Sequence, residues 1–510
     1  SIVFFLVFNL SSFIWLLALH PLTWQGLSNQ ESILVSVLAW ITPSITHTLI
    51  LLPFCIAFKL LLIFRAKERS CELNLLDIIA LAFLWVVIEH KLALGLGNNL
   101  RSFFVPINLL AYSQYQNLHF IQIANLVGSI GVEFILIFTN LLLSNLFNVH
   151  RIYDQSKIHS NNFSLNQQYF GIEKTSDYIG ISIGLAIILS LSCFYSYQTI
   201  NHYKKLRSSS SLKKIAILQA DFSAKFTRSS DGFDKLIQLQ TNLSQNIKNK
   251  VDFLFWTEGA IPRVNFDARY LAKSLENKAK TFNYGTFITE NGKTFNGLEN
   301  YSFGTELTDK SVLKAPDQGE LLNPEPLRVF EPKSKIHKDS YKKNILVAFG
   351  EYTPFYKQLP NKLKQLSKHS IGSGFDSSNE IKNIVTPYGN YAPSICFEIL
   401  FPEHIRKFIN KDTDFMVNLN DLSWFKNPIN LFGLELGFLK GLAHRMMLSA
   451  ATFRAIENNR DLVLASNSGI STIIHATGAH GQTTEINSIE LLEDDLLTQR
   501  ELSIYTQYGF

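Results

Sequence analysis

Cys396 is the residue of this 510-residue chain best placed to act as a nucleophile. It is the only cysteine after Cys193, and it lies where an apolar run at 392–395 gives way to a predicted helix that begins with Pro402. A thiol at such a junction can be exposed, can meet backbone N–H groups, and can therefore lose its proton more easily. The position thus indicates covalent catalysis by a cysteine.

Two further segments supply the groups that a nucleophilic thiol needs. Glu258 follows a hydrophobic strand predicted at 252–256, where burial would raise its pKa into the range of a general base. Lys343 and, eight residues later, Glu351 lie in another segment, where a lysine could stabilise the oxyanion of a tetrahedral intermediate. Each of these residues alone is more often structural, whereas the three together favour thiol acyl-transfer chemistry.

The composition favours a membrane protein and argues against several other classes. Apolar residues make up 46% of the chain and charged residues only 17%, a low share for a soluble protein. The net charge of +5 is small and much of the basic excess lies in short loops, so no nucleic-acid-binding stripe is expected. Four cysteines, at 55, 71, 193 and 396, have no metal-ligand spacing and offer Cys396 no disulfide partner.

Residues 1–200 are predicted to form a helical membrane domain with about five spans. The apolar runs are close to or above the twenty residues that a bilayer span needs, and they lie at 1–19, 33–64, 76–96, 120–147 and 178–197. The run at 33–64 contains two prolines and could be one kinked span or a hairpin. Five spans with basic loops inside place the chain after Tyr197 on the outer face, whereas a hairpin would reverse that orientation.

After a predicted linker at 201–212, residues 213–506 are expected to form a layered α/β domain. Short β-rich runs alternate there with amphipathic stretches. The predicted strands lie at 214–220, 252–256, 281–288, 301–306, 384–386, 392–395, 415–419, 462–465 and 471–476. The predicted helices lie at 233–248, 268–278, 402–409 and 438–458.

Three motifs give this chain a resemblance to a known family. They are Trp-Thr-Glu-Gly-Ala-Ile-Pro at 256–262, Lys343 followed after seven residues by Glu351, and Cys-Phe-Glu at 396–398 with Pro402 beyond it. In this order they resemble the nitrilase (carbon–nitrogen hydrolase) superfamily. The membrane-spanning first half narrows the resemblance to its membrane-bound branch, the apolipoprotein N-acyltransferase family.

The resemblance implies an α-β-β-α sandwich for the second half and a role for each motif residue. Glu258 would be the base, Lys343 the oxyanion-stabilising cation and Cys396 the nucleophile. Residues expected to support them are Glu351, Glu398, Phe397, Asn420 and Asp421. In the membrane half, Trp85, Glu89, Tyr112 and Gln114 are expected to line the lipid route, although helix packing and an interfacial aromatic belt also explain them.

The resemblance also implies substrates. The acyl donor would be a membrane phospholipid, with phosphatidylethanolamine as the expected one, and the acceptor would be a diacylated apolipoprotein. The acyl group would pass through a thioester on Cys396 in a ping-pong scheme. The location would be the bacterial inner membrane, with the catalytic domain on the periplasmic face. No metal or organic cofactor and no nucleic acid are implied.

Departures from the family pattern keep two other interpretations open. Phe397 stands where the family often has tyrosine, and the sequence ends at Phe510, about where the family begins a final transmembrane helix. The chain either lacks that helix or is a fragment. The alternatives to acyl transfer are a membrane-tethered amidase or nitrilase that hydrolyses a small amide, and a catalytically degenerate paralogue that binds lipid without turnover.

Overall fold

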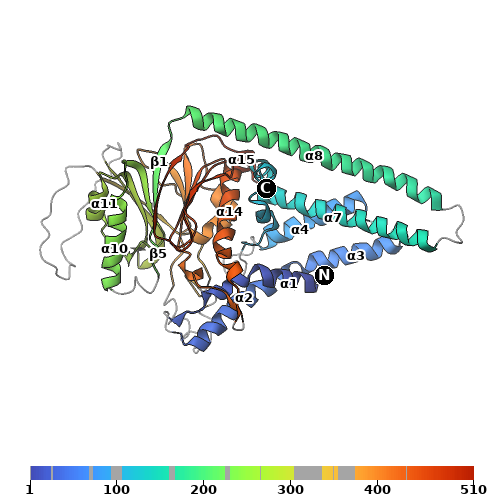
Figure 1. The fold of residues 1–510 in the computed structure, drawn as a ribbon, viewed down its shortest axis with the longest axis horizontal. Coiled ribbons are helices and arrows are strands. Elements are labelled where there is room, and N and C mark those ends of the chain that lie inside the picture. The colour runs from blue at the N-terminus through green and yellow to red at the C-terminus, as the bar shows by residue number, and fades with distance from the viewer. Residues whose placement is uncertain are drawn as a thin grey trace.

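A computed structural model gives the fold of the chain (Figure 1). It describes residues 2–23, 27–67, 73–93, 106–159, 167–223, 230–264, 266–303, 336–348, 350–353, 356, 374–431 and 434–509. Long helices extend from one side of a sandwich of two sheets, so the helical and the α/β parts of the sequence form two adjoining bodies.

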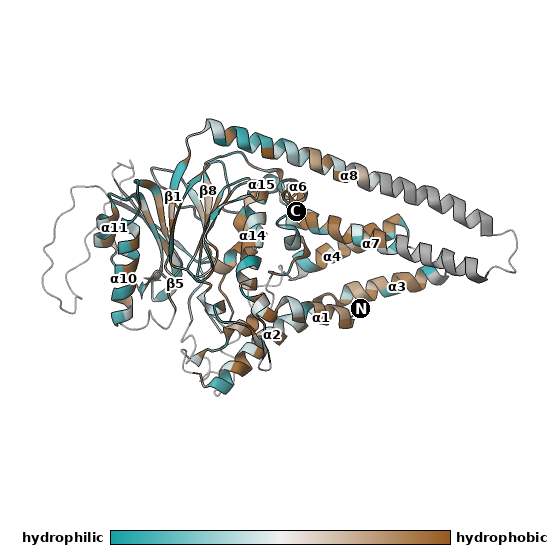
Figure 2. Cartoon of the chain, in the orientation of Figure 1, coloured by the Kyte–Doolittle hydropathy of each residue, from teal (hydrophilic) through white to brown (hydrophobic). Residues whose placement is uncertain are grey.

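The N-terminal part consists of helices rich in hydrophobic residues (Figure 2), and many of their apolar side chains are exposed. It comprises α1 (Ile2–Ser12), η1 (Ile14–Leu19), α2 (Asn29–Ile50), α3 (Leu52–Lys67), α4 (Leu75–Val86), η3 (Val87–Ala93), η4 (Leu110–Gln114), α6 (Leu118–Ile121), α7 (Ala124–His159) and α8 (Gln167–Ser209). Three segments of the described chain are long and apolar enough to cross a membrane, namely Ile2–Leu19, Asn29–Arg65 and Ala124–Asn145. Of the predicted span at 76–96, residues 76–93 lie in α4 and η3 and residues 94–96 lie outside the described residues. The predicted span at 178–197 lies within α8, and both spans stay predictions.

The segment 33–64 is one kinked helix and not a hairpin. Leu51 keeps a helical conformation between α2 and α3, and the amides of Leu51 and Cys55 donate to carbonyls four residues earlier. Pro43 is accommodated inside α2. The predicted linker at 201–212 also differs, because α8 continues as helix to Ser209. Its Tyr203 hydroxyl donates to the buried Asp461 of the α/β part at 2.9 Å, which fixes this end of the helix.

Two sheets build the α/β part. The first has the order β14-β1-β2-β4-β5-β6, with β3 also pairing with β4, and the second has the order β13-β12-β11-β8-β7. The strands of the first are β1 (Lys213–Gln219), β2 (Val251–Trp256), β3 (Ile261–Val264), β4 (Ala279–Glu290), β5 (Lys293–Phe303), β6 (Ile336–Lys342) and β14 (Glu490–Leu496). The strands of the second are β7 (Tyr391–Ile395), β8 (Phe415–Asn420), β11 (Leu462–Ser466), β12 (Thr472–Ile474) and β13 (His480–Thr483).

The sheets pack face to face through aromatic side chains. Phe253 of β2 contacts Phe415 of β8 at a ring distance of 5.1 Å, and Phe255 contacts Tyr391 of β7 at 5.9 Å. Because side chains alternate along a strand, the intervening Leu254 and Trp256 point to the opposite face, where they pack under helices α10 (Ser230–Gln245) and α11 (Arg269–Leu275). Both faces of the central strands are therefore buried, which explains their unbroken apolar sequences.

Helices cover the outer face of each sheet. α10 and α11 cover the first sheet, while α13 (Pro402–Arg406) and α14 (Leu442–Asn458) cover the second. This is the predicted α-β-β-α layering. α14 begins after Gly441, whose positive φ of 78° ends the preceding turn, so the helix starts four residues later than predicted from Phe438. Of the predicted strand at 384–386, only a single bridge from Ile384 to Tyr391 is present.

Candidate active site

Glu258 lies just beyond the C-terminal end of β2, in the first sheet. It is 8% exposed. The next residue, Gly259, has a φ of 66°, and a Cβ on Gly285 of the neighbouring strand β4 would lie only 2.6 Å from the Cα of Glu258. The two glycines thus let the backbone turn sharply after Glu258 and let β4 pass directly beside the backbone of that turn.

Lys343 follows β6 and is completely buried. Its Nζ lies 2.8 Å from Oε1 of Glu351 and 3.4 Å from Oε1 of Glu258. Asn296 of β5 donates from one amide nitrogen to both carboxylates, at 2.7 Å to Glu258 and 2.9 Å to Glu351. The amide of Val347 donates to the other oxygen of Glu351 at 2.8 Å. Three predicted residues therefore meet in one hydrogen-bonded cluster, organised by an asparagine that the sequence analysis missed.

Cys396 lies at a sharp bend between β7 and η6 (Cys396–Leu400). Its φ of 49° lies in the left-handed region, which a side-chain-bearing residue adopts only under constraint. Burial raises the pKa of the thiol, the charges of Glu258, Glu351 and Asp421 raise it further, and the charge of Lys343 lowers it. The nucleophile candidate thus shares one electrostatic environment with the acid and the cation.

The charges in this cluster are interdependent. Burial raises the pKa of Glu258 to about 7, a shift that Lys343 opposes and Glu351 reinforces. Burial alone would lower the pKa of Lys343, but the charges of Glu351, Glu258 and Cys396 raise it, so the ammonium group stays charged. The arrangement provides a carboxyl group that exchanges its proton near neutral pH beside a permanent cation, as general-base catalysis requires.

Glu398 joins the cysteine bend to the lysine segment. Its carboxylate accepts hydrogen bonds from the Tyr341 hydroxyl at 2.9 Å and from the backbone amides of Asn344 at 2.6 Å and Ile395 at 2.8 Å. Burial opposes its ionisation, but hydrogen bonding to His404 and backbone amides holds its pKa below the usual value. Through these hydrogen bonds the charged carboxylate of Glu398 links β6 of the first sheet to β7 of the second.

The remaining predicted supporting residues surround the same corner. The amide of Asp421 donates to Oε2 of Glu258 at 2.8 Å, and the side chain of Asp421 accepts from Asn467 at 3.0 Å. Asn420 ends β8 beside the cysteine bend and is 1% exposed, and its side-chain amide has no hydrogen-bond partner in the described part of the chain. Phe397 is half-buried with its ring 5.2 Å from that of Phe401.

The predicted residues of the membrane half form a separate cluster. The indole of Trp85 donates to Glu89 at 2.7 Å and lies 3.3 Å from Oε1 of Glu133, which in turn contacts His90 at 2.7 Å. All four side chains are buried. Glu133 was missed by the sequence analysis, although a lone acid inside the apolar run 120–147 was a usable signal.

Tyr112 and Gln114 lie on η4, nearer the sandwich. The ring of Tyr112 packs 5.4 Å from Phe453 of α14, and the partly exposed Gln114 donates to Ser113. None of the membrane-half residues joins the cluster around Glu258, so a lipid route past them stays a prediction.

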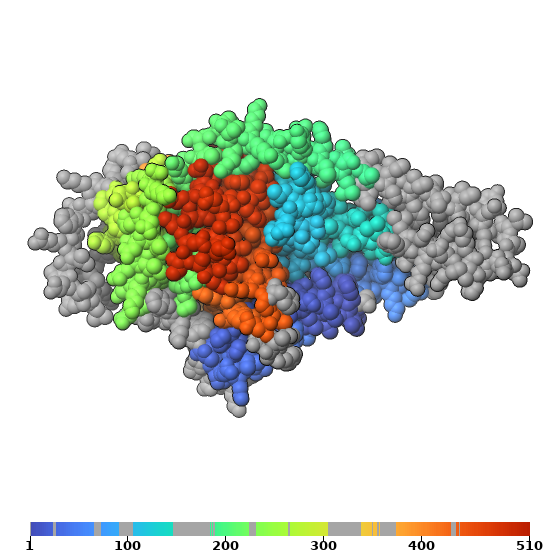
Figure 3. Space-filling model, viewed as in Figure 1, coloured from blue at the N-terminus to red at the C-terminus, as the bar shows by residue number. Residues whose placement is uncertain are grey.

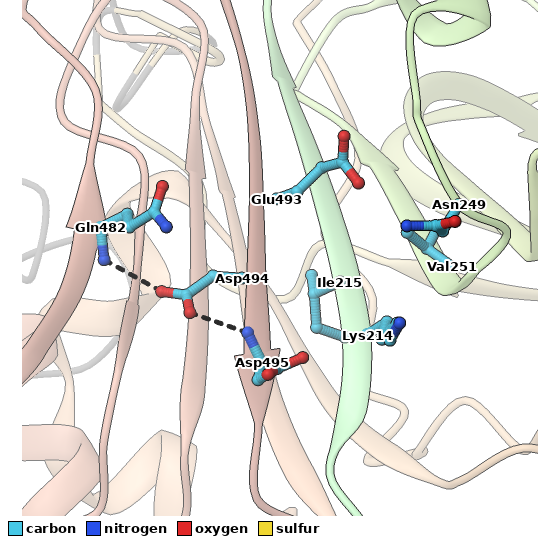
Figure 4. Close-up of a pocket in the computed structure, with 8 residues that line it drawn as sticks. All are labelled: Lys214, Ile215, Asn249, Val251, Gln482, Glu493, Asp494 and Asp495. Carbon is cyan, nitrogen blue, oxygen red and sulfur yellow. Dashed lines mark hydrogen bonds between the residues drawn. The ribbon is translucent and has the colours of Figure 1, made fainter.

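One pocket lies elsewhere, between β1 and β14 (Figure 4). It is lined by Lys214, Ile215, Asn249, Val251, Gln482, Glu493, Asp494 and Asp495, and it contains none of the predicted site residues. Asp494 already accepts hydrogen bonds from the amides of Gln482 and Asp495. Among the described residues, no group of three histidine, cysteine, aspartate or glutamate side chains is placed to hold a metal ion.

Solved structures similar to this chain include a CN-hydrolase superfamily protein from Xanthomonas campestris and an amidase from Nesterenkonia sp.. The first covers 56% of this chain and 91% of its own, with 12% identity and a TM-score of 0.34. The second covers 58% of this chain and 92% of its own, with 13% identity and a TM-score of 0.33. The layer arrangement given above rests on the strand pairing and not on these low scores.

Sequence relatives point to one family. The profile of the apolipoprotein N-acyltransferase N-terminal domain matches residues 1–142. An apolipoprotein N-acyltransferase from Geobacter metallireducens is 25% identical over 467 residues, covering 90% of this chain and 75% of the relative. One from Haemophilus influenzae is 27% identical over 256 residues, covering 48% of this chain and 41% of the relative. The predicted resemblance is therefore confirmed: this chain is similar to the apolipoprotein N-acyltransferases across its helical and its α/β parts.

Proposed function

We propose that the chain is a membrane-bound acyltransferase that moves a fatty acyl group from a phospholipid to the terminal amine of a diacylated apolipoprotein. The observation that carries the proposal is the buried cluster in which Nζ of Lys343 lies 3.4 Å from Glu258 and 2.8 Å from Glu351, with Cys396 at the bend after β7 and its thiol pKa affected by all three charges. The relatives named apolipoprotein N-acyltransferase and the apolar helices support the choice of a lipid donor and a lipoprotein acceptor.

In the first half-reaction, the carboxylate of Glu258 takes the thiol proton of Cys396. The thiolate attacks the ester carbonyl of the phospholipid, and the charge that develops on the carbonyl oxygen is stabilised by Lys343. The carbon–oxygen ester bond breaks, Glu258 returns its proton to the departing alkoxide, and a lysophospholipid leaves. The acyl group then remains on Cys396 as a thioester.

In the second half-reaction, the α-amine of the apolipoprotein attacks the thioester. Glu258 accepts the proton that the amine loses, the carbon–sulfur bond breaks, and the thiolate of Cys396 is restored to the thiol by that proton. The product is an amide. A pKa of about 7 suits Glu258 for both directions of proton transfer, because neither form is strongly preferred near neutral pH.

A two-stage mass measurement tests the proposal. The purified protein, reconstituted with phosphatidylethanolamine, should gain the mass of one acyl chain, located by peptide mapping to Cys396. Adding a diacylated lipopeptide should remove the adduct and yield an acylated peptide. Cys193 is an exposed thiol on α8, so Cys193→Ala is the matched control that must keep the adduct, whereas Cys396→Ala must lose it.

Each contrary outcome has a distinct meaning. Release of the adduct only as free fatty acid, even with the lipopeptide present, would identify a hydrolase. No adduct on Cys396 with any phospholipid would identify a protein that lacks acyl-transfer activity, and the proposed function would then be wrong.

A further inference from the structure

The segment 421–426 joins the N-terminal membrane segment to the proposed catalytic base. It contains η7 (Ser423–Phe425) and follows β8 directly. At one end, the amide of Asp421 donates to Oε2 of Glu258 at 2.8 Å. At the other end, the ring of Phe425 meets the indole of Trp15 edge-on at 4.8 Å. A membrane residue and the base are therefore attached to the two ends of one six-residue turn.

Trp15 belongs to η1, which continues from α1. Several side chains of α1, including Phe4 at 67% and Val3 at 73%, are exposed, as expected of a face in contact with lipid. Trp15 itself is only 5% exposed and packs against the sandwich. Figure 3 shows the N-terminal residues (dark blue) directly beside the residues of the 400s (orange). The short segment made of α1 and η1 therefore lies between lipid and the edge of the site.

The remaining contacts of the turn attach it to the sandwich. Lys426 pairs with Asp221 at 2.5 Å, and Asn467 donates both to Asp421 at 3.0 Å and to the carbonyl of Phe222 at 2.7 Å. The amide of Ser423 donates to Asp421 at 3.0 Å. These contacts hold the turn on the sandwich side, so Phe425 is the point at which the membrane side fixes it.

We propose that Trp15 is a positioning residue that holds the turn 421–426 so that the amide of Asp421 stays bonded to Glu258. The proposal deepens the proposed function by assigning the membrane segment a part in setting the base. The base faces Lys343 after β6, Glu351 in the following segment, Asp421 in the turn, and Cys396 at the bend. Of these neighbours, only Asp421 lies on the turn that Trp15 touches.

The physical consequence is a change in when Glu258 ionises. A hydrogen bond donated to a carboxylate favours its charged form, and each such bond lowers the pKa by roughly one unit. Loosening the turn weakens that bond, whereas the carboxylate of Asp421, whose charge also raises the pKa of Glu258, stays bonded to Asn467, so the pKa of Glu258 should rise. Because Cys396 reacts only when the base is ionised, the reactivity of the thiol should then require a higher pH.

The experiment measures alkylation of Cys396 by iodoacetamide against pH, by mass spectrometry on the full-length protein with Cys193 replaced by alanine. Trp15→Leu should move the midpoint of the acid limb upward by about one pH unit. Trp15→Phe should restore the midpoint, because the Trp15 indole N–H has no partner among the described residues and the contact is one of ring packing. Phe425→Leu should reproduce the shift, and the double variant should add nothing to it, because both changes break one link.

Trp40→Leu is the matched control. The indole of Trp40 donates to the carbonyl of Leu10 at 2.7 Å, so this change loosens the packing of α2 on α1 without removing the Phe425 contact. It should leave the midpoint unchanged. The proposal is overturned if Trp15→Leu leaves the midpoint in place, if Trp40→Leu moves it equally, or if the Trp15 and Phe425 shifts add.

Alkylation separates this inference from the proposed function. If the predicted shifts occur but the wild-type protein transfers no acyl group, the coupling is correct and the proposed function is wrong. If acyl transfer occurs and the shifts do not, the coupling is wrong and the function stands.

Discussion

Replacing Lys343 by methionine tests the charge balance of the site most directly. Methionine keeps the length and apolar character of the side chain but removes the ammonium group, which lies 3.4 Å from Glu258 and 2.8 Å from Glu351. Both carboxylates would then share the single amide nitrogen of Asn296 with no cation nearby. Like charges at this separation favour protonation of one of them.

The size of the effect follows from the Nζ–Oε1 distance. At 3.4 Å and an effective dielectric constant of about 20, the attraction between Lys343 and Glu258 is on the order of 5 kcal/mol. One pKa unit corresponds to about 1.4 kcal/mol, so the upper limit of the shift is about three to four units. Local relaxation reduces it, and we expect the pKa of Glu258 to rise from about 7 to about 9.

The direction of the pH dependence follows from which protonation state of Glu258 is active. Ionised Glu258 accepts the thiol proton, so in the wild-type protein the rate of Cys396 alkylation should rise as the pH passes about 7. In Lys343→Met the same rise should occur about two units higher, which is about a fiftyfold loss of rate at pH 7, because the ionised fraction of the base falls from about one half to about one hundredth. Acyl-adduct formation should fall by a further factor of about 10² to 10³, because the oxyanion also loses its cation.

The assay needs a control for folding, because an unpaired buried carboxylate costs about 3–5 kcal/mol. Lys342→Met is matched in position and chemistry. Lys342 precedes Lys343 and pairs with the exposed Glu290 on the other side of the strand, so its replacement should leave both rates unchanged. An acid limb in Lys343→Met within about half a unit of the wild-type value, with an unchanged melting temperature, would refute the reasoning.

Three further substitutions follow from single contacts. Gly285→Ala should lower acyl-adduct formation at least tenfold with the fold retained, because the new Cβ meets the backbone of the catalytic base, and circular dichroism beside the adduct assay checks both. Tyr341→Phe should cost about 1–3 kcal/mol in the free energy of unfolding, because Glu398 loses a hydrogen-bond donor, and denaturant titration measures it. Glu457→Gln should cost about 3–5 kcal/mol, because it leaves the buried Arg454 unpaired, and a melting temperature equal to that of wild type would contradict this.

The strands that the sequence analysis found are those buried on both faces. β2, β7, β8 and β11 each read as a largely apolar or small-residue run, interrupted by Asp252 in β2 and Asn418 in β8, since the second sheet or a helix covers each face. The strands that were missed include β3, β6, β13 and β14, of which β6 and β14 end the main strand order of the first sheet and β13 is an edge of the second. The sequences of β6 and β14, IHKDSYK and ELLEDDL, carry charges because one side of an edge strand meets solvent or loops. A search for apolar runs therefore loses strands where a sheet ends.

The residues of the candidate site likewise divide into those that the sequence revealed and those that it did not. Glu258 and Cys396 were recognisable because each follows a predicted strand, where a side chain projects from the end of a sheet. Asn296 lies inside β5, and nothing in its local sequence separates it from other polar strand residues; only the pairing of β5 with β6 brings it under Lys343. Sequence position identifies the groups that are proposed to react, whereas the groups that orient them depend on strand register.

The junction between the two halves shows why the boundary near residue 200 does not separate independent units. Gly128 has a φ of 67°, which breaks α7 and leaves the amide of Ser129 outside the helical bonding pattern. That amide donates to the carboxylate of Glu457 at 2.6 Å, in α14 of the sandwich. A Cβ on Gly128 would lie 2.6 Å from the ring of Tyr505, so the break is also filled by the last helix, α15 (Ile504–Tyr508). Each half therefore supplies polar partners that the other needs when buried, and the proposed link from Trp15 through the turn at 421–426 to Glu258 would be a second connection of this kind.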